Sequence, residues 1–283
     1  ASDVYKRQHI EDSFIEFNRE RLLMQMRHNE GPALAVADLN KDGVDDVYIG
    51  GGKNQSSSLF MSNHQDTYNQ IKEPFLNDSE SEDTNALFFD GDNDGDLDLV
   101  VASGGKSFSK YSLSLNDRYY INNGLGNFEK KKSALNFNKN ISTKALASAD
   151  VNNDGKIDIF FGERYDLTTY GKKGSGVLMI NDGQNSFTQA NQKVFSDIGM
   201  ITDAKFHDFN GDNWPDLIIV GEWMPITILI NKNGIFENHT DLYGLNQTSG
   251  LWNTIELIDI NLSLIHISEP TRRYAISYAV FCL

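Results

Sequence analysis

The sequence has 283 residues, and its 40 acidic against 25 basic side chains give a net charge of −15 at pH 7. A chain this acidic lacks the basic surface that phosphate binding needs, which excludes nucleic acid as a partner. No apolar run approaches the roughly 18 residues of a membrane-spanning helix, so no transmembrane segment is predicted.

Both ends of the chain are predicted to be translated sequencing adapter. Residues 3–8, DVYKRQ, back-translate to GAT GTG TAT AAG AGA CAG, and the opposite strand of those codons encodes LSLIHI, which is residues 262–267. One short DNA element in opposite orientations, resembling the transposase end used in sequencing libraries, therefore flanks the remaining residues. We expect residues 1–8 and 262–283 to be adapter scars outside the fold. The native part is then a fragment whose own N-terminus, with any export signal, is missing from the sequence.

Residues 9–31 precede the repeated part of the chain. Within them, IEFNRERLLMQM at residues 15–26 places apolar residues at helical spacing, which favours an amphipathic helix. The alternative is that this segment is the outer strand of a preceding repeat.

An aspartate-rich loop recurs through residues 32–261, and its first Asp stands at positions 38, 90, 150, 208 and 259. A period of roughly 50–60 residues is typical of repeat arrays and propellers. In each repeat an apolar strand enters the loop, a second leaves it, a third ends in Asn and a turn, and a fourth begins at an aromatic residue. The entering strands are predicted at 33–37, 86–89, 144–149 and 203–207, the leaving strands at 47–50, 97–102, 157–161 and 217–220, and the aromatic starts at Tyr68, Phe128, Phe187 and Phe236.

Four antiparallel strands per repeat make a propeller blade. The predicted fold class is therefore all-β, a β-propeller fragment that forms an open arc. It should contain four complete four-stranded blades and the start of a fifth. The blades are placed at about residues 32–80, 84–140, 143–197 and 201–245, with the partial blade at 251–261.

Oxygen-bearing side chains occupy positions 1, 3, 5 and 9 of each acidic loop, counted from its first Asp, and position 7 can offer its backbone carbonyl. Hard oxygen ligands at this spacing, with Gly at position 6 for a sharp turn, are typical of calcium loops. Position 6 is Gly in the first three loops and Asn213 in the fourth, and Asn tolerates the left-handed backbone. The predicted metal ligands are Asp38, Asn40, Asp42, Asp46, Asp90, Asp92, Asp94, Asp98, Asp150, Asn152, Asp154, Asp158, Asp208, Asn210, Asp212 and Asp216.

Two other kinds of loop share part of this pattern. An EF-hand needs a bidentate Glu at position 12, but that position is apolar in every loop: Ile49, Val101, Phe161 and Ile219. The loops could also be ordinary Asp/Gly turns without metal. Their fourfold recurrence argues against this, because several carboxylates so close together would repel one another without a cation. We therefore predict about four Ca²⁺ sites.

The D-x-[DN]-x-D-G-x-x-D loop between apolar strands, after Gly31-Pro32, resembles the FG-GAP/VCBS repeats of integrin α-subunit propellers. It is more similar to bacterial VCBS/FG-GAP proteins of the type associated with ASPIC/UnbV domains, which have segments comparable to GPALAVADLNKDGVDDVYIGG, DRYYINNGLGNF and GEWMPI. The resemblance covers nearly all of residues 9–261. It implies a seven- or eight-bladed propeller, calcium in the hairpin loops, and a secreted, periplasmic or cell-surface location. It implies no catalytic residue.

The connections between second and third strands should lie on the edge opposite the acidic loops, since successive turns of a meander alternate between two edges. Two of these connections are long and rich in Tyr, Ser and Lys, and long loops on a rigid scaffold often bind ligands. The residues predicted to contact a ligand are Tyr111, Arg164, Tyr165, Tyr170 and Trp223. The alternative is that the aromatic residues, Trp223 above all, pack against neighbouring blades and that Arg164 is a solvated charge.

Two pairs of charged neighbours stand outside the acidic loops. Asp117-Arg118 is predicted to be a structural ion pair, the alternative being a functional site. Glu82-Asp83 precedes a strand and is expected to be exposed, the alternative being that it reaches a metal.

The preferred function is a non-catalytic, calcium-binding propeller that serves as an adhesion or binding module. Its partner would be an extracellular protein, a glycan, or a sister domain of the same protein. The alternative is the propeller domain of a polysaccharide-acting lyase or hydrolase, which needs a base or a carboxylate pair in a cleft. The sequence offers no Ser/His/Asp arrangement for such chemistry, so no catalytic residue is predicted.

Overall fold

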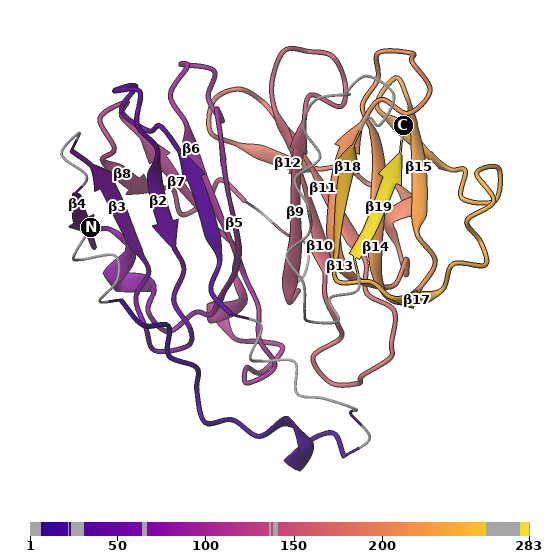
Figure 1. Ribbon diagram of the computed structural model, residues 1–283, viewed down its shortest axis with the longest axis horizontal. Helices are drawn as coiled ribbons and strands as arrows, with labels where there is room; N and C mark the ends of the chain where they lie inside the picture. The colour runs from indigo at the N-terminus through magenta and orange to yellow at the C-terminus, as the bar shows by residue number, and fades with distance from the viewer. Residues whose placement is uncertain are drawn as a thin grey trace.

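The computed structural model describes residues 7–21, 23, 31–63, 67–135, 137, 141–258 and 278–282. In these ranges the chain forms four antiparallel sheets that follow one another from the N-terminus onward (Figure 1), together with one parallel pair of strands near the C-terminus. Its helical structure there consists of short 3-10 turns. The predicted fold class is confirmed: the protein is all-β, with four four-stranded sheets arranged as an open arc of propeller blades. No helix in the described part of the chain is long and apolar enough to cross a membrane.

Each sheet is a simple meander in which strands that follow one another in sequence are hydrogen-bonded neighbours. The first sheet contains β1 (Leu34–Ala37), β2 (Asp46–Ile49), β3 (Ser58–Ser62) and β4 (Tyr68–Ile71), and the second contains β5 (Asp83–Phe89), β6 (Asp98–Ser103), β7 (Arg118–Asn122) and β8 (Phe128–Lys130). The third contains β9 (Thr143–Ala149), β10 (Asp158–Glu163), β11 (Gly176–Asn181) and β12 (Phe187–Gln189), and the fourth contains β13 (Met200–His207), β14 (Asp216–Met224), β15 (Thr227–Lys232) and β16 (Ile235–Asn238).

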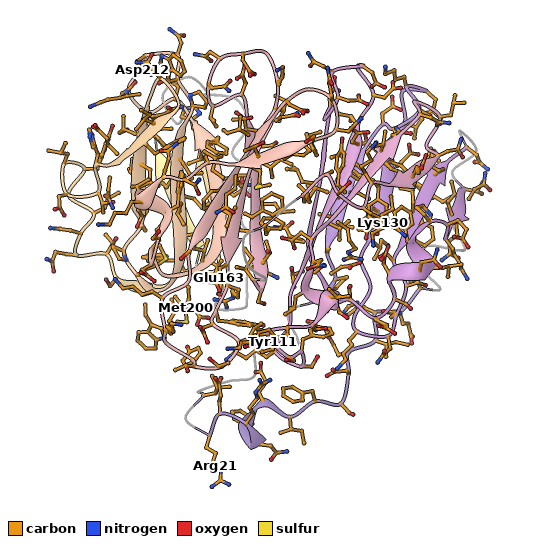
Figure 2. All side chains as sticks on the ribbon, turned by 180° about the vertical axis from the view of Figure 1, so that it is seen from behind. Arg21, Tyr111, Lys130, Glu163, Met200 and Asp212 are labelled. Atoms are coloured by element: carbon orange, nitrogen blue, oxygen red, sulfur yellow. The ribbon has the colours of Figure 1, made fainter. Side chains whose placement is uncertain are left out.

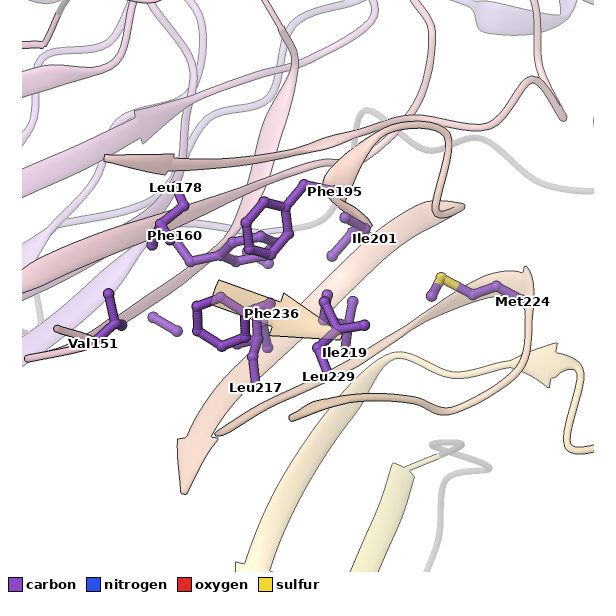
Figure 3. Close-up of a cluster of buried hydrophobic side chains, with 13 residues drawn as sticks. Val151, Phe160, Leu178, Phe195, Ile201, Leu217, Ile219, Met224, Leu229 and Phe236 are labelled. Carbon is purple, nitrogen blue, oxygen red and sulfur yellow. The ribbon is translucent and has the colours of Figure 1, made fainter. Parts of the chain in front are cut away.

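The sheets stack face to face, which explains why β6 and β10 are buried along their whole length. Between the third and fourth sheets, Phe160, Phe195 and Phe236 pack with Leu217 and other aliphatic side chains (Figure 3). Similar clusters fill the spaces between the other neighbouring sheets. Each fully buried large side chain contributes about 1.5–3 kcal/mol, so apolar contacts between blades hold the arc together.

The first strands of neighbouring sheets also contact one another through polar side chains. Thr84 on β5 donates a hydrogen bond to the carbonyl of Thr143 on β9 (2.5 Å), and Asn85 donates to the carbonyl of Lys144 (2.8 Å). These bonds tie the second sheet to the third along their first strands.

After the fourth sheet, a short strand β17 (Gly250–Leu251) pairs with β14, and β18 (Thr254–Ile258) follows. The N–H of Ile255 donates to the carboxylate of Asp203 on β13 (3.0 Å), and the Ile255 side chain is buried against Ile218 and Val220. Strand β18 therefore continues the stack at the place predicted for the start of a fifth blade. It pairs in parallel with β19 (Tyr278–Cys282), which lies within the predicted adapter residues; residues 259–277 lie outside the described ranges.

The segment before the first sheet differs from its prediction. Over residues 15–21 the expected helix is wrong, because these residues form only the 3-10 turn η2 (Glu16–Asn18); residues 22 and 24–26 of the predicted helix lie outside the described ranges. The described part runs along the lower ends of the sheets in the view of Figure 1. Arg19 and Glu20 make polar side-chain contacts there, which a periodicity analysis cannot detect.

Candidate functional sites at the two edges

The acidic loops connect the first strand of each sheet to the second, so all four lie along one edge of the stack. Figure 2 shows Asp212 of the fourth loop at this edge, while Tyr111, Glu163 and Arg21 lie at the other. Below, the first is called the acidic edge. The edge formed by the loops between second and third strands, together with the N-terminal segment, is called the opposite edge.

Backbone N–H groups fold each acidic loop around its carboxylates. The carboxylate at position 1 accepts a hydrogen bond from the N–H at position 6, at 2.8 Å in the first, third and fourth loops and 3.0 Å in the second. The carboxylate at position 5 accepts from the N–H at position 7 at 2.8–3.0 Å. Such local bonds are characteristic of Asp and Asn turns. They curl the loop, so that its side-chain oxygens converge.

The loop backbone takes a left-handed conformation twice. At position 6 the φ angle is +86°, +87° and +84° at the three glycines and +66° at Asn213, which confirms that Asn replaces Gly there in the same conformation. The second left-handed residue, at position 4, was not predicted. It is Lys41, Asn93, Asn153 or Gly211.

The second loop has the donor set that best fits a cation. One oxygen of each of Asp90, Asp92 and Asp94 lies within 4.8 Å of the others. Hard carboxylate oxygens this close together suit a divalent cation such as Ca²⁺. In the other loops position 3 is Asn, whose amide nitrogen donates to the carboxylate at position 5, for example from Asn210 to Asp212 at 2.8 Å. Those loops therefore offer two carboxylates and an amide oxygen.

The carboxylate at position 9 links the loop to the sheet in every repeat. In the second loop, Asp98 accepts from the N–H of Asn122 at 2.8 Å with one oxygen and from the N–H of Gly91 at 3.2 Å with the other. The equivalent residues Asp46, Asp158 and Asp216 make the same pair of bonds. All four are buried, and desolvation raises the pKa of Asp98 and Asp158 to about 6. These residues were predicted as ligands, and the structure also gives them a structural role.

A second recurring residue, the Asn that ends the third strand, was not recognised as functional in the sequence. Its side-chain N–H group donates both to its own loop and to the loop of the preceding blade. Asn181 donates to the carbonyl of Gly91 in the second loop (2.9 Å) and to that of Ile157 in its own (3.0 Å). Asn122 and Asn231 repeat this arrangement. The recurring Asn at this position was visible in the sequence, but its bond to another repeat was not.

At the opposite edge, the five predicted ligand residues differ in exposure, and Tyr170 is half-buried. Tyr111 and Trp223 are exposed, at 78% and 56%, whereas Arg164 and Tyr165 are buried at 4% and 3%. The expectation that Trp223 packs inside the structure is therefore wrong. The interpretation of Arg164 as a solvated charge is also wrong, because it forms a buried ion pair with Glu222 at 2.8 Å.

A chain of polar contacts connects these residues. The indole N–H of Trp223 donates to the hydroxyl of Tyr170 (3.0 Å), and that hydroxyl donates to Glu222 (3.0 Å). The backbone of Trp223 is left-handed, with φ +56°, which is uncommon for a bulky side chain. The exposed indole is therefore fixed in place by its hydrogen bond and by its backbone.

The Asp83–Arg118 ion pair corrects two expectations about charged neighbours. Asp83 is not exposed but buried, and it also accepts hydrogen bonds from the hydroxyl of Tyr48 and the N–H of Gly51 in the first blade. Arg118 thus pairs with Asp83, and not with its neighbour Asp117 as predicted. The pair lies within the second blade, and the hydrogen bonds that Asp83 accepts from Tyr48 and Gly51 connect it to the first blade at the opposite edge.

Asp117 instead connects the second blade to the third. It accepts from the N–H of Ser103 at 2.7 Å and from the hydroxyl of Thr143 at 2.8 Å. Burial raises the pKa of Asp117 to about 7.

Comparison with known proteins supports the repeat assignment. Residues 90–161, from the start of the second acidic loop to the strand after the third, match the model of the FG-GAP-like repeat. This confirms the predicted resemblance over those residues. Among solved structures, the chain is similar to the V. cholerae biofilm matrix protein Bap1, with 16% identity and a TM-score of 0.40 over 73% of this chain and 27% of that one. The chain therefore spans about a quarter of the length of that protein. No curated protein sequence matches it.

Proposed function

Starting from the FG-GAP-like repeat, we propose that the chain is part of a calcium-binding β-propeller that acts as a non-catalytic binding or adhesion module. Its location would be secreted, periplasmic or cell-surface, where calcium is available at the roughly millimolar level that such modules require. The observation that carries the proposal is the convergence of Asp90, Asp92 and Asp94, in a loop design that recurs four times.

In each loop, the side chains at positions 1, 3 and 5 and the carbonyl at position 7 would hold the ion. The carboxylate at position 9 adjoins this set, and its two backbone hydrogen bonds connect the loop to the sheet. A bound cation supplies positive charge that offsets the repulsion among the carboxylates. Calcium would therefore stabilise the loops and, through position 9, the second and third strands of each blade.

Ligand binding is assigned to the opposite edge. Trp223 and Tyr111 expose aromatic surface there, and fixed aromatic residues give large contact areas at a low cost in conformational entropy. A bulky residue in a left-handed conformation also indicates local strain of the kind that clusters at functional sites. The partner would be an extracellular protein, a glycan or a sister domain.

Thermal unfolding of the chain in chelator and in calcium tests the metal assignment. Calcium at about ten times its dissociation constant should add about 1.4 kcal/mol per site, so the melting temperature should rise clearly. Asp94→Ala in the second loop, and Asp154→Ala in the third, should each remove part of that rise. Asp45→Ala is the matched control, because it removes the same charge from an exposed loop position that is not a predicted ligand. A melting temperature that chelator leaves unchanged would refute the calcium assignment.

A further inference from the structure

A buried lysine at the opposite edge has its acidic partner in the N-terminal segment. Lys106, in the connection between β6 and β7, is only 1% exposed, and its Nζ lies 4.9 Å from the centre of the Tyr165 ring and 5.5 Å from that of Tyr170. It forms an ion pair with Glu20, which lies 86 residues earlier in the chain. A carboxylate thus occupies a cationic, aromatic-walled pocket formed by the propeller.

Both oxygens of the Glu20 carboxylate are used. One accepts from the Lys106 ammonium group, and the other accepts from the backbone N–H of Tyr170 at 3.0 Å. The neighbouring Arg19 donates to the carbonyl of Lys106 at 2.9 Å and lies 3.4 Å from that of Phe108. Glu20 therefore binds a cation and a backbone N–H, which suit its negative charge. Arg19 binds two backbone carbonyls, which suit its positive charge.

We propose that this pocket is a recognition site for a peptide that carries an Arg-Glu pair, and that Arg19-Glu20 is its intramolecular occupant. The inference rests on the proposed function, because it names the ligand class for the opposite edge. The pocket consists of Lys106, the N–H of Tyr170, the rings of Tyr165 and Tyr170, and the carbonyls of Lys106 and Phe108.

Burial explains why the pocket requires a carboxylate. Lys106 is shielded from water, and a buried charge is stable only when an opposite charge compensates it. Arg164 and Glu222, which adjoin the same Tyr170 side chain, form an ion pair with each other. When the N-terminal segment leaves, the ammonium group of Lys106 loses Glu20, and a peptide that again covers this lysine must supply a carboxylate in its place.

One observation favours a peptide over an acidic polysaccharide. The contacts of Arg19 require a cation directly beside the carboxylate, which a chain of uronic acids does not carry.

An external peptide must compete with the attached segment. A tethered ligand acts at an effective concentration on the order of millimolar, so the intact chain should bind the peptide weakly. A chain whose own segment cannot occupy the pocket should bind it well. The segment therefore works as a competitor built into the protein.

The test measures fluorescence anisotropy of a labelled peptide with the sequence of residues 14–23, FIEFNRERLL. The receptor is the full chain with Arg19→Ala and Glu20→Ala. It should bind the peptide at least tenfold more tightly than the wild-type chain does, and at least tenfold more tightly than it binds the same peptide with Glu20→Gln. Adding Lys106→Met to the receptor should abolish binding. Adding Lys172→Met, which removes an exposed lysine from the same edge, should leave binding unchanged.

Equal binding of the Glu and Gln peptides would overturn the proposal, and this comparison remains decisive even if Lys106→Met fails to fold. Binding of a uronic-acid oligosaccharide in the absence of peptide binding would overturn it as well. The calcium melting experiment separates the two proposals. A calcium-dependent rise in melting temperature without peptide binding rejects only the peptide site, whereas peptide binding without that rise rejects only the calcium module.

Discussion

The two edges of the propeller arc are held together in different ways. At the acidic edge the same short-range hydrogen bonds recur in each repeat, from position 1 to position 6 and from position 9 to the third strand. At the opposite edge the buried ion pairs differ from blade to blade and join distant parts of the chain, as in Lys106–Glu20 and Arg164–Glu222. The acidic edge therefore has the same hydrogen-bonded loop structure in every blade. At the opposite edge the contacts that could determine ligand binding differ from blade to blade.

The two edges also differ in how their charged side chains are neutralised. The acidic edge gathers carboxylates of one sign, which a cation would stabilise. The opposite edge pairs buried charges of opposite sign within the protein. Chelation should therefore weaken the first edge, while removal of one partner should damage the second whether or not calcium is present.

The largest expected effect is that of Asp83→Ala at the opposite edge. The substitution leaves Arg118 buried without its partner, and breaking a buried pair in this way costs about 3–5 kcal/mol. The free energy of unfolding, measured by urea denaturation, should fall by this amount both in chelator and in calcium. Lys232→Ala, which breaks an exposed ion pair with Glu237, is the control and should change little. A loss at Asp83 as small as that of the control would contradict the idea that buried pairs hold this edge.

A pH effect should come next in size. Because burial raises the pKa of Asp117 to about 7, the folded protein keeps this proton up to about pH 7, whereas the unfolded chain releases it near pH 4. Between these values the folded state binds more protons, so the free energy of unfolding should fall as the pH rises, by at most on the order of 4 kcal/mol from this group.

Asp117→Asn should remove part of this fall in stability between pH 4.5 and 7. Asp98 and Asp158, whose pKa values are raised to about 6, should contribute in the same direction in chelator, so some slope should remain. Urea denaturation at several pH values measures the slope for both proteins. If the variant has the same slope as the wild type, Asp117 does not titrate as described.

The sequence predicted the acidic edge far better than the opposite edge. The spacing of Asp and Gly defines loops whose contacts are local, so the strands on either side and the left-handed Asn213 followed from the pattern. The left-handed residue at position 4 was missed, because residues as different as Lys41 and Gly211 occupy it. The bond from Asn181 to the preceding blade was missed because it joins two repeats that are far apart in sequence.

At the opposite edge, the sequence indicated where a ligand site could lie but not how the residues are arranged. Tyr111 and Trp223 are exposed as a ligand site requires, but Arg164 and Tyr165 are buried. Nothing in the spacing of Glu20 and Lys106 suggested that they meet. A helical period suggested a helix for residues 15–26, yet the described part of that segment is held by individual polar contacts, which leave no periodic signal.

The smallest expected effect tests the regularity of the acidic edge. Asn181→Ala leaves the carbonyls of Gly91 and Ile157 without their side-chain donor, at a cost of about 1–3 kcal/mol. Because Asn122 and Asn231 make equivalent bonds, Asn122→Ala and Asn231→Ala should cost nearly the same in urea denaturation. The Asn181 bond also holds the second acidic loop against the third blade, so its loss should reduce the calcium-dependent rise in melting temperature. If the three substitutions lower the free energy of unfolding by widely different amounts, equal geometry at the acidic edge does not imply equal stabilisation.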